Sequence, residues 1–281
     1  MKLKIITDSS CDLTANEAKE LNVTVIPLSI NIDGKEYKDG VDINKEKFYE
    51  LLINGKGMPK TSQPPLGEFV QAFTEAKKNN EVVLTILIAK SLSGTINSAY
   101  LAKEMVDYDQ IYIIDSCTTI AGIQILINEA TKLNKQGKTI QEIIDTLNDL
   151  KSRIVVLACM NTLEYLYRGG RLSRVTAFVG NLINIKPLIM FKEDGSVSVI
   201  SRQLGMTRAN KAMISVMDKR PIDPKYGIYY YYSHNLENLE HFIAALKKFG
   251  KYLAGKIINL SPAVGCHIGD NAYGLVYVCA K

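Results

Sequence analysis

Two hydroxyl-rich segments have the spacing expected of an anion site. Thr61-Ser62-Gln63-Pro64 lies directly before a helix that the prolines would open, and Ser91-Leu92-Ser93-Gly94-Thr95 follows an aliphatic run and precedes another helical pattern. Free N–H groups and the helix dipole at a helix N-terminus favour a bound anion, and Gly94 permits close approach of the backbone. Because Ser and Thr also act as ordinary helix caps, each segment alone fits either role.

A histidine and an arginine cluster supply further candidate ligands. His267 lies between glycines in a turn-rich segment before the last apolar run, where its ring can donate a hydrogen bond to a carboxylate. Arg168, Arg171 and Arg174 surround a Gly-Gly pair, and guanidinium groups suit bidentate capture of a carboxylate or phosphate. The same three arginines would also serve as a solvated charge run.

Several other kinds of site lack their usual signature. The histidines show no metal-ligand spacing. The five cysteines are an odd, scattered set without a C-x-x-C pair, so we expect reduced thiols and neither a disulfide framework nor a zinc site. A P-loop, a G-x-G-x-x-G fingerprint and a G-x-S-x-G elbow are all missing from the sequence. Without these motifs, the sequence predicts neither a bound metal nor a cofactor.

Composition indicates a compact globular protein. The chain has 281 residues, 47% of them apolar, which suits two domains with substantial cores. Its net charge of +5 is too mild to imply nucleic acid and fits an anionic ligand or an acidic partner. The apolar run at residues 3–7 leaves no room for a signal peptide, and no run approaches the roughly 18 apolar residues of a transmembrane segment. We expect a soluble cytoplasmic protein.

The first half of the chain alternates strand and helix patterns. Strands are predicted at residues 5–7, 23–32, 82–89 and 111–114. Nearly continuous aliphatic runs that alternate with helices are typical of a parallel sheet covered on both faces. Capping boxes at Thr14 to Glu17 and at Thr139 to Glu142 mark the starts of two helices. We predict an α/β domain with a parallel sheet over residues 1–151.

After residue 151 the pattern changes. Asp194-Gly195 separates two β-rich runs and is a strong hairpin signal. Further strands are predicted at residues 154–160, 228–232, 256–260 and 273–279. These features predict a second, α+β domain with a mostly antiparallel sheet over residues 152–281, and a ligand cleft between the two domains.

The order of these segments resembles the DegV family over essentially the whole chain. The matching pieces are Thr7-Asp8-Ser9-Ser10-Cys11-Asp12-Leu13, Thr61-Ser62-Gln63-Pro64, Leu92-Ser93-Gly94-Thr95 with Ser98-Ala99, Asp115-Ser116, Leu166-Tyr167-Arg168-Gly169-Gly170-Arg171 and the loop of His267. Each piece is weak alone, but their order and spacing make the match specific. The chain departs from many relatives in having Gly269-Asp270-Asn271 where a Gly-Pro-Gly-like turn is common, which puts a negative charge near the proposed head group.

The resemblance implies a bacterial, non-catalytic lipid-binding protein. Such a protein holds a long-chain fatty acid between its domains and presents the carboxylate to a separate fatty acid kinase, and an acyltransferase of phospholipid synthesis then uses the acyl phosphate. Carried over residue by residue, the ligand contacts are Thr61 or Ser62, Ser93 with Gly94 and Thr95, and His267. Arg171 and Arg174 would lie on the face used for the kinase or the acyl phosphate. A fatty acid is then the only ligand, with no further cofactor.

Burial of an acyl tail is energetically reasonable. At about 0.8 kcal/mol per methylene, a tail of about 16 carbons offers roughly ten kcal/mol before entropy costs. The apolar residues 177–179 and 182–183 would line the acyl tunnel or fill the core. Two alternatives stay open: a hydrolase with Ser93 as nucleophile and His267 as base, which lacks a well-placed third group, and a carrier of another amphipathic carboxylate or phosphate such as an isoprenoid acid.

Overall fold

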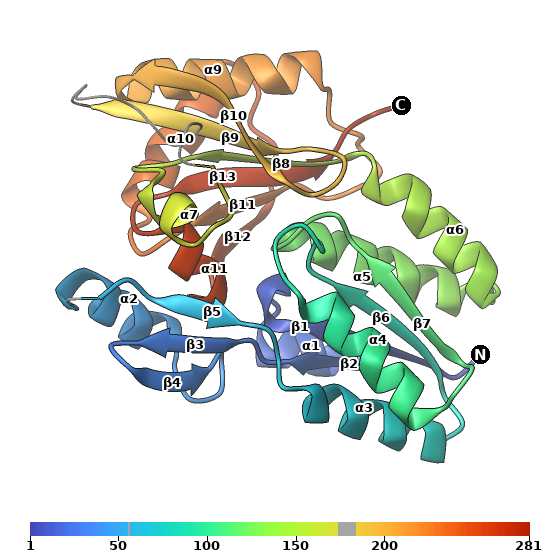
Figure 1. The fold of residues 1–281 in the computed structure, drawn as a ribbon. Helices are drawn as coiled ribbons and strands as arrows, with labels where there is room; N and C mark the ends of the chain where they lie inside the picture. The colour runs from blue at the N-terminus through green and yellow to red at the C-terminus, as the bar shows by residue number, and fades with distance from the viewer. Residues whose placement is uncertain (56, 174–183) are drawn as a thin grey trace.

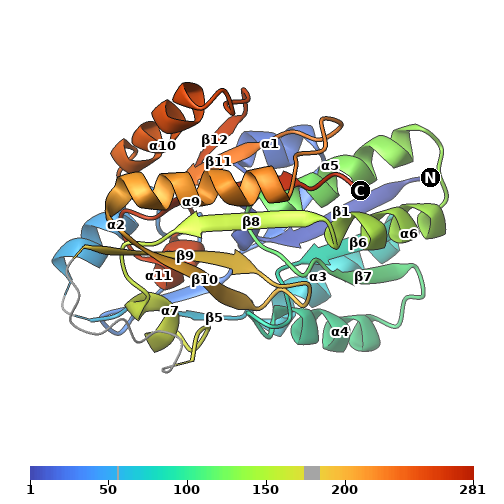
Figure 2. The same cartoon turned by 90° about the horizontal axis from the view of Figure 1, so that it is seen from above.

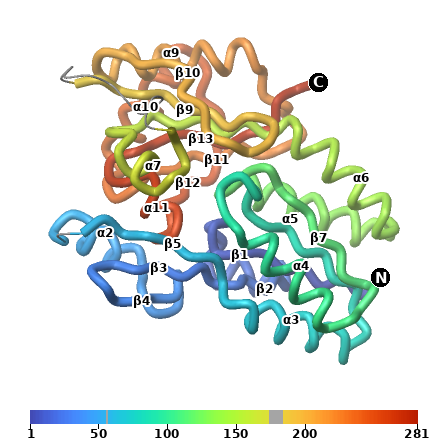
Figure 3. The backbone as a smooth tube through the Cα atoms, viewed as in Figure 1, coloured from blue at the N-terminus to red at the C-terminus, as the bar shows by residue number. Residues whose placement is uncertain are grey.

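The computed structural model describes residues 1–55, 57–173 and 184–281 (Figure 1). Arg174 and the apolar residues 177–179 and 182–183 lie outside the described residues. The described chain forms two large sheets with helices packed between them (Figures 1 and 3). A smaller third sheet lies beside the two large sheets. No helix among the described residues is both long enough and apolar enough to cross a bilayer.

The first large sheet is parallel, as the aliphatic runs predicted. Its strands are β1 (Leu3–Asp8), β2 (Val23–Ile26), β6 (Val82–Leu87) and β7 (Ile111–Asp115), in the order β2-β1-β6-β7. Each neighbouring pair is parallel. The carboxyl ends of these strands therefore meet at one edge, where open α/β sheets bind their ligands.

Helices cover both faces of the parallel sheet. Helices α3 (Leu66–Lys78) and α4 (Thr95–Val106) pack on one face through residues such as Phe69, Phe73 and Ala99. Helix α5 (Ala121–Lys135) packs on the other face and also contacts β8 and β13 of the second large sheet, and α6 (Ile140–Lys151) packs against α5. The predicted capping boxes are confirmed at the starts of α6 and of α1 (Ala15–Glu20).

The second large sheet is mostly antiparallel, which confirms the predicted fold class. Its strands are β8 (Ile154–Cys159), β9 (Ile185–Phe191), β10 (Val197–Leu204), β11 (Tyr229–Tyr232), β12 (Lys256–Asn259) and β13 (Tyr273–Val278), in the order β10-β9-β8-β13-β11-β12. Among the strand pairs described in this sheet, β11–β12 is the only parallel one. Helices α9 (Gly205–Lys219) and α10 (Glu237–Lys248) cover the face turned away from the first sheet (Figure 2). After α6 the chain leaves the first large sheet and enters the second at β8. The division of the chain into two domains at residue 151 stays a prediction.

One predicted strand was wrong. Residues 23–32 form two strands, because Pro27 has no N–H for a sheet ladder and the N–H of Leu28 donates to Ser9 Oγ at 3.1 Å instead. The second piece, β3 (Ser29–Ile32), joins β4 (Lys35–Lys38) and β5 (Lys60–Ser62) in a three-stranded antiparallel sheet. Helices α2 (Lys45–Asn54) and α11 (Pro262–Ile268) pack on this sheet and share its core.

Two predicted site segments also have a different local structure. Thr61 lies in β5 opposite Ile30, and α3 begins only at Leu66, so Thr61 and Ser62 do not sit at a helix N-terminus. His267 lies in the last turn of α11 and not in a turn-rich loop. Pro262 in the first turn of α11 suits a helix start, whereas the flanking glycines had suggested a loop.

Candidate functional site

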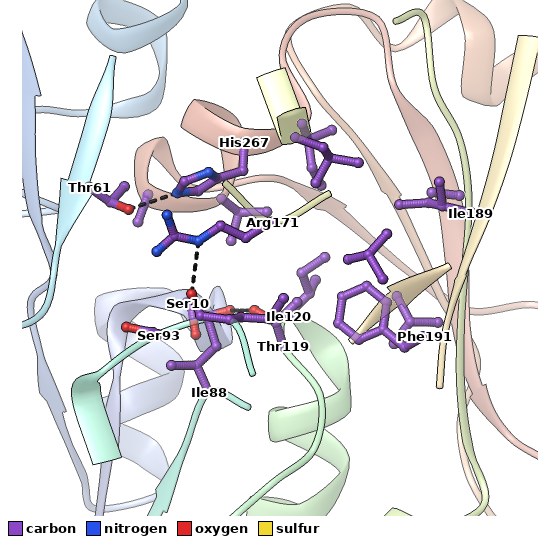
Figure 4. A pocket seen from close by; sticks show the side chains of 18 of the residues that line it. Ser10, Thr61, Ile88, Ser93, Thr119, Ile120, Arg171, Ile189, Phe191 and His267 are labelled. Atoms are coloured by element: carbon purple, nitrogen blue, oxygen red, sulfur yellow. Dashed lines mark hydrogen bonds between the residues drawn. The ribbon is translucent and has the colours of Figure 1, made fainter. Parts of the chain in front are cut away.

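A cavity lies between the two large sheets. Polar side chains occupy one end and apolar side chains the other (Figure 4). The polar residues are Ser10, Thr61, Ser93, Thr119, Arg171 and His267. The apolar residues include Ile120, Val156, Ala158, Ile189, Phe191, Val197 and Val264, and also Ile88, which lies beside Ser93 at the polar end. The cavity thus has the polarity of a site for an amphipathic molecule.

His267 and Thr61 form the centre of the polar end. His267 Nε2 lies 2.7 Å from Thr61 Oγ1. Burial, and secondarily the positive charge of Arg171, lowers the pKa of His267 to about 4, so the imidazole is neutral near pH 7. His267 Nδ1 is buried without a partner in the described chain and faces Gly169, where a Cβ would lie 2.3 Å from it.

These contacts select one tautomer of His267. Buried N–H groups without an acceptor are rare and costly, so the ring proton belongs on Nε2, where Thr61 Oγ1 accepts it. The Thr61 hydroxyl proton then remains available to an acceptor in the cavity. In effect, His267 orients Thr61 as a donor.

Arg171 gives the polar end a positive charge. Its Nε donates to the carbonyl oxygen of Leu92 at 2.9 Å, and its Nη1 donates to the carbonyl of Gly169. A turn at Gly170, with a φ of 76°, carries the chain back so that the Arg171 N–H bonds to Leu166 O at 2.9 Å. Desolvation lowers the pKa of Arg171 from its ordinary value, but an arginine stays charged. Among the described lining residues there is no Asp or Glu to balance it.

The Ser93 segment lies where it was predicted. Helix α4 begins at Thr95, and Ser93 Oγ lies 2.8 Å from Thr95 Oγ1 and accepts the Thr95 N–H at 3.3 Å. Gly94 packs closely against Gln63, since a Cβ there would lie 2.1 Å from Gln63 Oε1. Neither Gly94 nor Thr95 lines the cavity, so of this segment only Ser93 and Leu92 face the ligand space.

The structure therefore brings some predicted residues together and not others. Thr61, Ser93 and His267 line one cavity, and Arg171, which we expected on a partner face, lines it with them. Ser62 is exposed and lies outside the cavity lining, as strand alternation requires of the neighbour of Thr61.

The sequence matched the segment after β1 to the family, but we predicted no ligand contact there. Ser10 lines the cavity, and its N–H and Oγ both donate to Asp8, which also accepts the Ile88 N–H at 2.8 Å. Burial is the main reason that the pKa of Asp8 is raised. Thr119 joins the same network, because its hydroxyl donates to the Ser10 carbonyl at 3.3 Å. The available signal was the position of these residues after the carboxyl ends of parallel strands in one sheet.

Ile120 is held in the cavity by a strained backbone. Its φ of 54° is a conformation that β-branched residues rarely adopt, and such strain costs on the order of 1 to 3 kcal/mol. Its N–H donates to the Ser10 carbonyl at 2.8 Å, which helps to hold this geometry. The strain places a buried, apolar side chain between the polar and apolar ends of the cavity (Figure 4).

The described residues do not assemble a hydrolytic triad. Ser93 Oγ bonds to Thr95, and His267 Nε2 bonds to Thr61. No described group orients Nδ1 of His267, which a general base requires. Asp270 does not line the cavity, and its carboxylate accepts a bond from the Asn271 side chain. The expected negative charge of Asp270 is therefore not part of the cavity wall.

Comparisons with known proteins agree with this fold. The sequence model of the DegV family, described as an uncharacterised protein family, matches residues 2–280. A DegV domain-containing protein of Caldanaerobacter subterraneus is 36% identical over 98% of both chains. The solved structure of a fatty acid binding DegV family protein from Streptococcus agalactiae has a TM-score of 0.90 at 27% identity, with all of both chains covered. The solved structure of a DegV family protein from Thermus thermophilus, described as fatty acid binding, has a TM-score of 0.88 at 26% identity, again with all of both chains covered. The chain belongs to the DegV family.

Proposed function

We propose that this protein binds a long-chain fatty acid in the cavity between its two large sheets. The observation that carries the proposal is the polarity of that cavity: one end holds Arg171 and donor hydroxyls without an acidic side chain among the described lining residues, and the remainder is apolar. A carboxylate satisfies the first end and an acyl tail the second. The two similar structures described as fatty acid binding support the same ligand class.

In this proposal three side chains bind the carboxylate. The Thr61 hydroxyl donates to it while accepting the His267 Nε2 proton, and the Ser93 hydroxyl donates from the start of α4. Arg171 supplies the compensating charge. His267 acts through Thr61 and stays neutral in the empty protein, so it costs little to bury.

We further propose that the protein is a carrier and not itself an enzyme. A separate fatty acid kinase would phosphorylate the exposed carboxylate oxygen, and an acyltransferase of phospholipid synthesis would consume the acyl phosphate in the cytoplasm. The protein then needs only to fix the geometry of the ligand, which fits the missing triad among the described residues. Arg171, and Arg174 outside the described residues, would contact the acyl phosphate or the kinase.

The first test is native mass spectrometry of the freshly purified protein, followed by denaturing extraction and identification of any released molecule. One equivalent of a long-chain fatty acid is the expected result. A protein that is purified empty and does not bind added fatty acids would refute the proposal. Release of an isoprenoid acid or another amphipathic acid would mean that this molecule, and not a fatty acid, is the ligand.

The carrier role has a separate test. The loaded protein is incubated with ATP, with and without the fatty acid kinase of the same organism, and acyl phosphate is trapped with hydroxylamine. Product is expected only with the kinase. Turnover of a fatty acyl ester by the protein alone, lost in Ser93→Ala, would instead establish a hydrolase.

A further inference from the structure

The apolar end of the cavity is closed by the β9–β10 hairpin. Ile189 and Phe191 lie two residues apart on β9 and face the cavity, and Phe191 pairs with Val197 across the hairpin. Figure 4 shows Ile189 and Phe191 at the end opposite His267 and Arg171. These three residues are the hairpin's contribution to the described cavity lining.

The tip of the hairpin is packed against the parallel-sheet half of the molecule. Gly195 is buried with a φ of 78°, and a Cβ there would lie 2.5 Å from the Cβ of Ala89 and 2.9 Å from the backbone of Cys117. Ala89 and Cys117 follow β6 and β7. The hairpin therefore bridges the two large sheets and forms a wall supported on both sides.

A second hollow, which we call the basic groove, lies on the other side of this wall. It is lined by residues that include Cys117, Lys151, Met190, Lys192, Glu193, Ile200 and Arg220, so cations outnumber the single carboxylate among the described lining residues. In the described part of the chain Phe191 is the one residue that lines both hollows. The surroundings change there from aliphatic side chains in the cavity to charged side chains in the basic groove, namely Lys151, Lys192, Arg220 and Glu193.

We infer that Phe191 ends the path of the acyl tail and sets the longest chain that the protein accepts. This inference rests on the proposed function. A methylene that stays among Ile120, Ile189 and Val197 gains burial, and each buried methylene raises affinity about fourfold, since it contributes about 0.8 kcal/mol. A methylene forced past Phe191 would enter the basic groove, where hydrated charged side chains and solvent remove that gain.

The test is a competition among saturated fatty acids of increasing chain length, offered as an equimolar mixture solubilised by cyclodextrin. The bound lipids are extracted and quantified for the wild type, Phe191→Ala, Phe191→Leu and Leu204→Ala. Leu204 is the matched control, because it lies on the same hairpin, is 52% exposed and lines neither hollow.

The preferred length should shift upward in Phe191→Ala, by a smaller step in Phe191→Leu, and not at all in Leu204→Ala. Each methylene newly accommodated should enrich the longer acid about fourfold over the wild-type distribution. Val197→Phe narrows the same end of the cavity and should shift the preference to shorter chains.

The outcomes separate the two proposals. A wild type that binds no fatty acid overturns the proposed function and this inference together. A wild type that binds fatty acid, with the same length distribution in the folded Phe191 and Val197 variants, overturns only the role of Phe191. If Phe191→Ala does not fold, Phe191→Leu and Val197→Phe decide the question.

Discussion

Two buried polar groups lie on opposite sides of the same two short helices, η1 (Ser9–Cys11) and α11. On one side, Ser10 and His267 line the cavity described above. On the other side, Ser9 and the residue before α11, Ser261, contact a pair of carboxylates, Asp12 and Asp39. We call Asp12, Asp39 and Lys45 the acidic cluster.

The two groups meet the cost of burial in different ways. In the acidic cluster Asp12 lies 3.8 Å from Lys45 Nζ and accepts the Ser261 N–H at 2.6 Å, and Asp39 accepts the Ser9 hydroxyl at 2.7 Å. Its charges are thus partly compensated from within the chain. The cavity instead holds Arg171 with no acidic neighbour among the described lining residues. The comparison teaches that the chain itself partly neutralises the acidic cluster, through Lys45 and the raised carboxyl pKa of Asp39. The described lining of the cavity has no acidic side chain that could neutralise Arg171 in the same way, so a bound anion would have to do so.

The two groups also shift pKa values with opposite consequences for stability. Burial, reinforced by Arg171, lowers the pKa of His267 to about 4. Burial raises the pKa of Asp39 to about 7. The hydrogen bond from Ser9 opposes this shift, and the negative charge of Asp12 adds to it. Acidification should therefore weaken the fold through the cavity and strengthen it through the acidic cluster.

The largest effect is expected from His267 in acid. The unfolded chain takes up the histidine proton near its ordinary pKa, but the folded protein only near pH 4, so stability is lost as the pH falls between these values. His267→Gln should remove about 3 kcal/mol of that loss, measured as the free energy of unfolding in urea across the range. Bound fatty acid should also reduce the loss in the wild type, because its carboxylate favours the protonated ring. An unchanged pH profile in His267→Gln would show that this ring is not the group concerned.

Loss of the cavity charge should be the next largest effect. Arg171→Ala removes the cation that faces the carboxylate and should weaken fatty acid binding by roughly 1.5 to 3 kcal/mol in a calorimetric or fluorescence titration. Arg168→Ala is the matched control, because Arg168 belongs to the same turn but pairs with Glu164 at the surface and does not line the cavity. Equal loss in both variants would mean a general effect of positive charge.

The acidic cluster should show the reverse pH dependence. The folded protein holds the Asp39 proton up to about pH 7, while the unfolded chain releases it near the ordinary aspartate pKa, so stability falls as the pH rises between them. Asp39→Asn should reduce this fall by about 2 kcal/mol between pH 5 and pH 7. Fatty acid affinity at neutral pH should stay unchanged. A large loss of affinity in this variant would contradict the separation of the two groups.

The smallest effect distinguishes two adjacent hydroxyls. Thr61→Val keeps the shape of the side chain but removes the hydroxyl that donates to the carboxylate and accepts the His267 Nε2 proton. Fatty acid binding should therefore weaken by about 1 kcal/mol. Ser62→Ala should have no effect, because Ser62 is exposed and lies outside the cavity lining. The same titration measures both variants, and a loss confined to Ser62→Ala would reverse the assignment.

Local sequence patterns determined much of this protein. Aliphatic runs with alternating helices predicted the parallel sheet, Asp194-Gly195 predicted the β9–β10 hairpin, and the two capping boxes predicted where α1 and α6 begin. The predicted position of Ser93, after a strand and before a helix, agrees with β6 and α4, because both elements are its neighbours in the chain. In each case the deciding interactions join residues a few positions apart, so the sequence alone carries them.

Only the tertiary structure decided how the site is assembled. Thr61 and His267 are 206 residues apart, and their contact depends on β5 pairing with β3 and on α11 packing against that sheet. Arg171 turns into the cavity because the carbonyl of Leu92, 79 residues earlier in the chain, accepts its Nε proton. Contacts of this kind form when buried polar groups from distant segments satisfy one another. No local propensity encodes them, because each segment alone has water as an equally good partner.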